Sequence, residues 1–80
     1  MREKQLRFVA TFSTTTAAME MERYCLANGI PGRLIPTPRQ ITADCGLAWS
    51  APPEAEPAVL RAARDGSVEL AATYQLMLAF

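Results

Sequence analysis

The chain has 80 residues, half of them apolar, which allows one domain with a core near the smallest that folds without a disulfide, a metal or a partner chain. Eight basic and eight acidic residues cancel and form no run of one sign, so the charge pattern of a nucleic-acid or membrane-surface binder is missing. Histidine is absent, which excludes Ser-His-Asp and Cys-His sites within one chain, and two cysteines cannot complete a structural zinc site.

The first predicted element is a β-strand over residues 6–12, because apolar side chains occupy every second position. They are Leu6, Phe8, Ala10 and Phe12. The hydroxyl run at residues 13–16 offers several N-caps for a helix, and Asn28-Gly29 predicts the end of that helix. The predicted apolar stripe of the helix contains Ala18, Met21, Cys25 and Leu26. The chain therefore opens with a strand followed by a helix.

The second half predicts two short strands, a helix and a last strand. Residues 33–35 form the first of these strands, at a sheet edge because Pro36 and Pro38 follow it. A loop runs to about Asp44, and residues 47–49 form the next strand. The helix opens at residues 52–54 and ends at Asp65-Gly66, and its candidate core residues are Ala55, Val59, Leu60 and Ala63. Residues 71–80 predict the final strand, although their composition also suits a helix.

The order of these elements is strand-helix-strand-strand-helix-strand. This is the βαββαβ arrangement of the split βαβ, or ferredoxin-like, α+β fold, in which two helices cover one face of a four-stranded antiparallel sheet. The sequence contains no repeat, linker or low-complexity segment. We therefore expect one domain over residues 1–80.

Cys45 is the residue that we expect to carry chemistry, because its place in a loop beside Gly46 suits access and core packing does not require it. In the predicted topology the strand after Cys45 starts at the end of the sheet where the first helix begins, and it pairs with the first strand. Cys45 and the helix N-terminus should therefore be neighbours. Unsatisfied backbone N–H groups and a partial positive charge at a helix N-terminus favour the thiolate, which is the nucleophilic form of cysteine.

Four residues near Cys45 are candidates for supporting roles. Gly46 would let a partner's backbone or a bulky sulfur substituent approach closely. The hydroxyls of residues 13–16, among which Ser13 and Thr14 are the named candidates, could donate hydrogen bonds to an anion, and Arg39 could add a positive charge. Asp44 acts in the opposite direction, so the sequence does not give the sign of the net electrostatic effect.

Several short motifs resemble one family. They are Phe12-Ser13-Thr14, Ala18-x-x-x-Glu22, Gly29-Ile30, Pro36-x-Pro38-Arg39 and Cys45-Gly46-Leu47. Together they resemble the bacterial DUF3343 family of Se/S carrier protein-like proteins. The resemblance is close over residues 6–50 and looser beyond them, and its most specific part is Pro-x-Pro-Arg before Cys-Gly. Pro38 therefore joins the candidate site residues.

The resemblance implies a carrier rather than a turnover enzyme. Its cysteine would accept sulfur or selenium as a persulfide or selenosulfide and pass it on, with no cofactor or metal. A cysteine desulfurase or a selenocysteine lyase would be the donor. Selenophosphate synthesis or another sulfur-using protein would be the acceptor. Neither nucleic acid nor membrane is an expected partner, and a homodimer is possible for so short a chain.

Two other interpretations remain open at this point. A thiol redox or sensing protein would use Cys45 in a disulfide, although no Cys-x-x-Cys motif is present. A ligand-binding or assembly module would use the sheet surface and would not need Cys45. Cys25, on the apolar stripe of the first helix, is most simply a small buried hydrophobe. No apolar run approaches the length of about 20 residues that a membrane span needs, and reduced thiols favour a cytoplasmic location.

Overall fold

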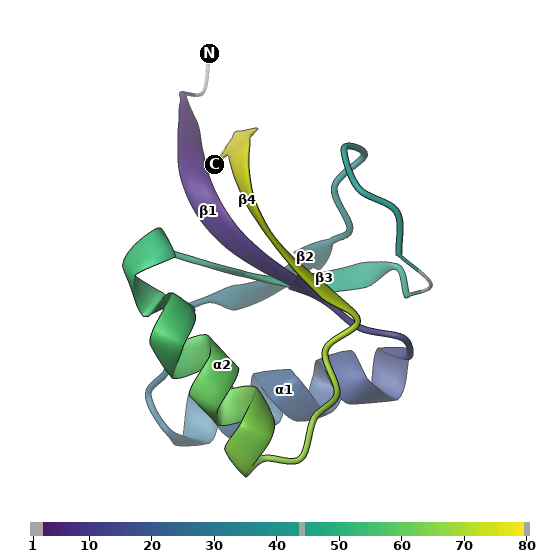
Figure 1. Cartoon of the computed structure of the whole chain (residues 1–80), viewed down its shortest axis with the longest axis vertical. Coiled ribbons are helices and arrows are strands. Elements are labelled where there is room, and N and C mark those ends of the chain that lie inside the picture. Colours follow the sequence, from purple (N-terminus) through teal and green to yellow (C-terminus); the bar gives the residue numbers. More distant parts are fainter. Residues whose placement is uncertain (1–2, 44, 80) are drawn as a thin grey trace.

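The computed structural model describes residues 3–43 and 45–79, which form four strands, two α-helices and one 3₁₀ turn (Figure 1). The elements in chain order are β1 (Lys4–Thr11), α1 (Thr15–Ala27), β2 (Arg33–Pro36), β3 (Leu47–Ala51), η1 (Pro53–Ala55), α2 (Glu56–Asp65) and β4 (Ala72–Ala79). The strand order is β2-β3-β1-β4 and each neighbouring pair is antiparallel. Both helices lie on one side of the sheet. The predicted ferredoxin-like fold is confirmed, including the final strand.

The helix boundaries follow local chemistry. Thr14 has an extended backbone, and its hydroxyl accepts a hydrogen bond from the N–H of Ala17, so Thr14 is the N-cap of α1. Gly29, which follows the C-cap Asn28, has a φ of 66° in the left-handed region that glycine adopts without strain. The 3₁₀ turn η1 leads directly into α2, which carries a proline in its first turn, where the missing N–H costs nothing. Neither described helix is long and apolar enough to cross a membrane.

The core lies between the sheet and the two helices. Its largest members are Phe8, Phe12 and Trp49 on the sheet side, with Met21 and Val59 on the helices. The prediction of a core position is wrong for two residues, since Leu26 is 71% exposed and Leu60 is 41% exposed. Each follows a core residue by one position, which turns it about 100° away from the packed face. In α2 the buried positions are Val59, Ala62 and Ala63.

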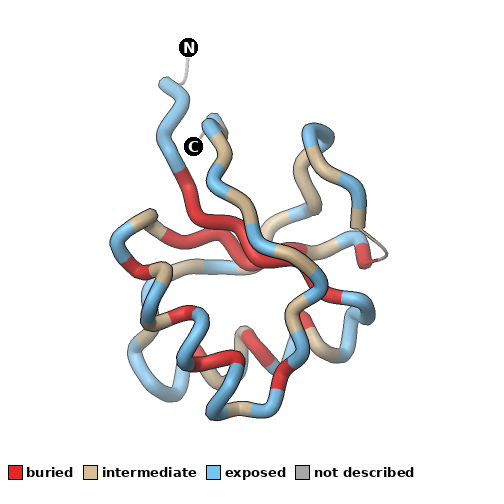
Figure 2. Tube along the Cα trace, in the orientation of Figure 1, coloured by how far each residue is buried: buried red, intermediate tan, exposed pale blue. Residues whose placement is uncertain are grey.

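The face of the sheet away from the helices, called the outer face below, is also partly buried. Val9 and Ala48 on this face are fully buried, and Ser50 is 1% exposed (Figure 2). The upper ends of β1 and β4 and the loop between β2 and β3 rise on this side of the sheet (Figure 1). Residues of this loop and of the ends of β1 and β4 line a groove over the outer face.

Candidate functional site

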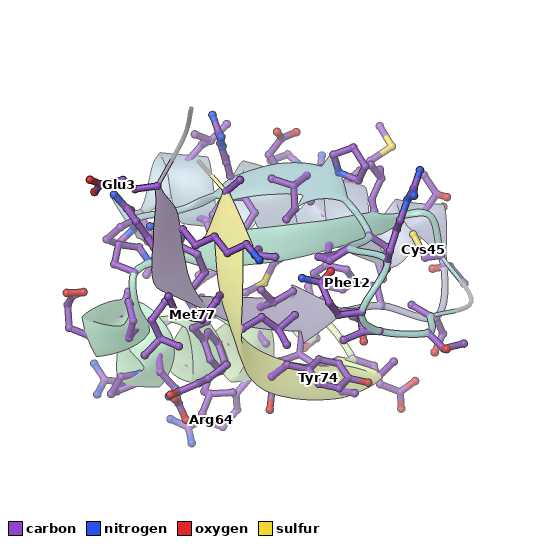
Figure 3. All side chains as sticks on the ribbon, turned by 90° about the horizontal axis from the view of Figure 1, so that it is seen from above. Glu3, Phe12, Cys45, Arg64, Tyr74 and Met77 are labelled. Carbon is purple, nitrogen blue, oxygen red and sulfur yellow. The ribbon has the colours of Figure 1, made fainter. Side chains whose placement is uncertain are left out.

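Cys45 lies just before β3, at the end of the sheet where α1 begins. Because β3 pairs antiparallel with β1 through Ala48 and Thr11, the start of β3 is next to the segment that leads into α1. Figure 3 shows Cys45 and Phe12 at this same end of the sheet. The hydroxyl of Thr15, the first residue of α1, is 3.8 Å from the sulfur of Cys45. The predicted neighbourhood of Cys45 and the first helix is therefore confirmed.

Among the residues that the structure describes, two polar groups contact the sulfur of Cys45. The backbone N–H of Leu47 donates a hydrogen bond to Sγ at 3.3 Å. The Thr15 hydroxyl makes the second contact, in which either atom can be the donor. A sulfur atom that carries negative charge only accepts hydrogen bonds, so in the thiolate both groups would act as donors. The partial positive charge of the α1 N-terminus would also favour negative charge on this sulfur.

The backbone around Cys45 is held by Thr37, on the opposite side of the loop. The Thr37 hydroxyl donates to the carbonyl oxygen of Cys45 at 2.9 Å, and the Thr37 N–H donates to the carbonyl oxygen of Gly46 at 3.0 Å. These bonds continue the pairing of β2 with β3 beyond Pro36 and Leu47. The segment is thus fixed from two directions, through its carbonyls by Thr37 and through its sulfur by Leu47 and Thr15.

Cys45 is only 4% exposed and packs with the core, whereas the sequence suggested an accessible thiol that the core does not need. That expectation is wrong, because the turn before β3 points the side chain inward to the end of α1. The residues around it are at the surface, since Thr15 and Gly46 are both exposed. The thiol therefore lies directly beneath the surface.

Gly46 has neither of the usual structural reasons to be glycine. Its φ is outside the left-handed region, and a side chain added there would meet open space. The effect of a glycine at this position is instead to leave the surface beside Cys45 uncovered. This agrees with the predicted approach of a partner, and it does not test that prediction.

The other predicted site residues lie apart from the sulfur. Ser13 is exposed, and the hydroxyl of Thr14 is used to cap α1. Arg39 is exposed, and with Pro38 it lines a groove on the outer face. No contact among the described residues joins any of these four side chains to the Cys45 sulfur. Asp44 lies outside the described residues.

Two threonines of the site are not among the named candidates. Thr15 belongs to the hydroxyl run at residues 13–16 that was expected to serve an anion, but the residue that would begin the helix could not be fixed to one position. Thr37 could have been found by extending the antiparallel register of β2 and β3 by one residue pair.

Cys25 differs from Cys45 although both thiols are free. It is fully buried on α1, and burial raises its pKa from its usual value of 9.0 to about 11. At neutral pH it is therefore a neutral thiol inside the core. Among the described residues, no group of three or more histidine, cysteine, aspartate or glutamate side chains is placed to hold a metal ion.

Comparison with known protein families gives a match. The model of the family described as "Putative Se/S carrier protein-like" matches residues 7–75, from β1 to β4 and including Cys45. The match extends well beyond residues 6–50, where the sequence motifs are concentrated. No curated protein and no solved structure shows significant similarity to the chain. Because the match covers well over half of its length, the chain belongs to the Se/S carrier protein-like family.

Proposed function

We propose that the protein carries sulfur or selenium on Cys45, as a persulfide or a selenosulfide, and passes it to an acceptor protein. The observation that supports this most is the Cys45 sulfur beside the first residue of α1, with the Leu47 N–H bonded to it at 3.3 Å. The family description names sulfur and selenium as the cargo. The protein would act in the cytoplasm as a carrier, whose Cys45 is loaded in one step and returned to the free thiol in the next.

The proposed loading step needs no oxidant and no metal. The Cys45 thiolate attacks the outer sulfur of a persulfide on the donor protein, and a bond forms between the two sulfurs. The bond within the donor persulfide breaks, and the donor cysteine leaves as a thiolate with the electron pair. In the relay step an acceptor thiolate attacks the outer sulfur on Cys45 in the same way, and Cys45 leaves as a thiolate. A selenium atom takes the place of the transferred sulfur in the selenosulfide case.

The contacts of Cys45 suit both steps. Cys45 is the nucleophile in loading and the leaving group in relay, and its sulfur carries negative charge before the first step and after the second. The Leu47 N–H and the Thr15 hydroxyl are placed to stabilise that charge in both cases. The shallow burial of Cys45 would shield a persulfide from water and small oxidants until a partner displaces the cover.

The proposal includes two classes of partner protein, a donor and an acceptor. A cysteine desulfurase or a selenocysteine lyase would supply the cargo. An enzyme of selenophosphate synthesis or another sulfur-using protein would receive it. A dimer of the chain is not needed for either step, because both contacts to the sulfur come from the same chain.

Intact-protein mass spectrometry tests the proposal. The reduced protein is incubated with a cysteine desulfurase and cysteine, or with a selenocysteine lyase and selenocysteine. We expect the wild type and Cys25→Ser to gain the mass of one sulfur or selenium atom and Cys45→Ser to gain none. Gain of mass by Cys45→Ser to the wild-type level would refute the proposal. A mixed disulfide with the donor that is never resolved would point to redox chemistry instead.

A further inference from the structure

A groove crosses the outer face of the sheet, on the side away from the helices and from the Cys45 sulfur. Its volume is about 510 Å³. Residues 36–40 form one wall, and the ends of β1 and β4 form the other. In Figure 1 these parts rise together on the side of the sheet opposite the helices. All four strands contribute to the lining, and Ser50 of β3 lies on the floor.

The charges in this groove have one sign. Lys4, Arg33 and Arg39 line it, and no acidic residue is among the described residues that do so. Arg7 does not line the groove and is buried next to its floor, where its Nε donates to the hydroxyl of Ser50 at 3.1 Å. Burial lowers the pKa of Arg7, the charge of Arg33 lowers it further, and Glu54 raises it. Three of the eight basic residues of a chain whose net charge is zero therefore line this one surface.

Most of the remaining lining is apolar. Ile35, Pro38 and Leu78 line the groove together with the basic side chains, so it offers hydrophobic contact as well as positive charge. The two described α-helices, which carry Glu20, Glu22, Glu56 and Asp65, lie on the other side of the sheet (Figure 1). A suitable occupant carries negative charge and at least one apolar side chain.

The dimensions favour a peptide over a small anion. The four strands span about 14 Å from β2 to β4, at the usual spacing of about 4.8 Å between strands. A phosphate ion would engage one end of such a groove only. An extended chain rises about 3.3 Å per residue, so about four residues would span the groove. Lys4 lies on one wall and Arg39 on the other, which places a basic side chain at each end of that segment.

We propose that this groove binds an extended acidic segment of a partner protein, with an apolar side chain between its acidic residues. A second copy of this chain is a poor occupant, because two copies that meet through this face would bring Lys4, Arg33 and Arg39 against the same residues. The proposal depends on the lining of the groove and does not depend on the chemistry of Cys45.

Fluorescence anisotropy tests the proposal with two labelled peptides, one alternating glutamate and leucine and the other alternating lysine and leucine. We expect only the acidic peptide to bind, with an affinity that falls as salt is added. The double variant Lys4→Glu/Arg39→Glu should weaken binding by about tenfold or more, because two charge-assisted contacts are reversed. Arg61→Glu is the matched control, since Arg61 is exposed on α2, away from the groove. Circular dichroism checks that each variant is folded.

Several results would overturn the proposal. The acidic peptide should bind at millimolar concentration or below, and absence of binding there contradicts the inference. Equal binding of the lysine peptide, or an equal loss in Arg61→Glu, would show that the groove is not the site. Full displacement of the peptide by millimolar inorganic phosphate would indicate a small-anion site. A dimer in analytical ultracentrifugation that dissociates in the double variant would assign the groove to a second copy.

Discussion

The two cysteines of this chain are both buried, and their surroundings differ. Cys25 lies in the last turn of α1 with apolar neighbours, and its raised pKa of about 11 keeps it neutral. Cys45 lies where a loop, a strand and a helix N-terminus meet, and an N–H and a hydroxyl contact its sulfur. Exposure alone would not separate a structural from a chemical thiol here, since Cys25 is 0% and Cys45 is 4% exposed. The polar contacts separate them.

The largest expected difference between the two thiols is in loading. Cys45→Ala should abolish transfer of sulfur from a persulfide donor, because the atom that forms the new bond is gone. Cys25→Ala should load to the wild-type extent, measured by intact mass under the same conditions. Loading of Cys45→Ala to the extent of Cys25→Ala would mean that Cys45 is not the residue that accepts the sulfur.

The pH dependence of stability should reveal Cys25. Its pKa is higher in the folded protein than in the unfolded chain, so the unfolded chain loses the thiol proton first as the pH rises. The contribution of the neutral, buried Cys25 thiol to stability is therefore fully present below pH 9 and is lost between about pH 9 and 11. The free energy of unfolding should fall by about 2–3 kcal/mol over this range. Urea titrations at several pH values measure this loss.

Cys25→Ala is the matched variant for that experiment. It should be less stable at neutral pH, because it leaves a small cavity, but its stability should fall less steeply above pH 9. The comparison isolates the thiol from the other groups that titrate at high pH. If the stability of the two proteins falls in parallel above pH 9, burial does not raise the pKa of Cys25.

Loss of the Thr15 hydroxyl should have a smaller effect on the reactivity of Cys45 than loss of the thiol itself. Thr15→Val keeps the shape of the side chain and removes the hydroxyl, and it should slow alkylation of Cys45 by iodoacetamide about fivefold if the hydroxyl stabilises the thiolate. Thr16→Val is the control, because Thr16 is the next exposed residue of the same helical turn. An equal effect of both variants would assign the loss to the helix start and not to the contact with sulfur.

Thr37 should change the same rate in the opposite direction and to a smaller extent. Thr37→Val removes the hydrogen bond to the Cys45 carbonyl, which should lower the cost of opening the loop by about 0.6 kcal/mol and so speed alkylation about threefold. Thr42→Val, in the same loop and exposed, should leave the rate unchanged. A slower reaction in Thr37→Val would mean that this bond aligns the thiol and does not cover it.

The sequence predicted the fold and the place of Cys45 because both follow from the order and periodicity of the elements. The burial of Cys45 could not be predicted in this way. It depends on the direction of one side chain in a turn, which is set by the Leu47 N–H and by core packing rather than by any local pattern. The helix faces were predicted to within one residue, which was enough to misplace Leu26 and Leu60.

The groove was beyond the reach of the sequence for another reason. Its basic residues, Lys4, Arg33 and Arg39, are far apart along the chain and form no run of charge. Only the strand order, which places β2 and β4 at the two edges of one curved sheet, brings them to one surface. Arg39 was expected beside Cys45 because the two share a loop, but the loop presents them on different sides.

Thr37 belongs to both surfaces, since it lines the groove and bonds to the carbonyls of Cys45 and Gly46. An occupant that presses on this residue would change how easily the loop opens over the thiol. This coupling is reciprocal. If a bound segment changes the equilibrium constant for modification of Cys45 by some factor, then modification of Cys45 changes the affinity for that segment by the same factor. A loaded and an empty carrier would differ in their preference for a partner, which is what directed transfer requires.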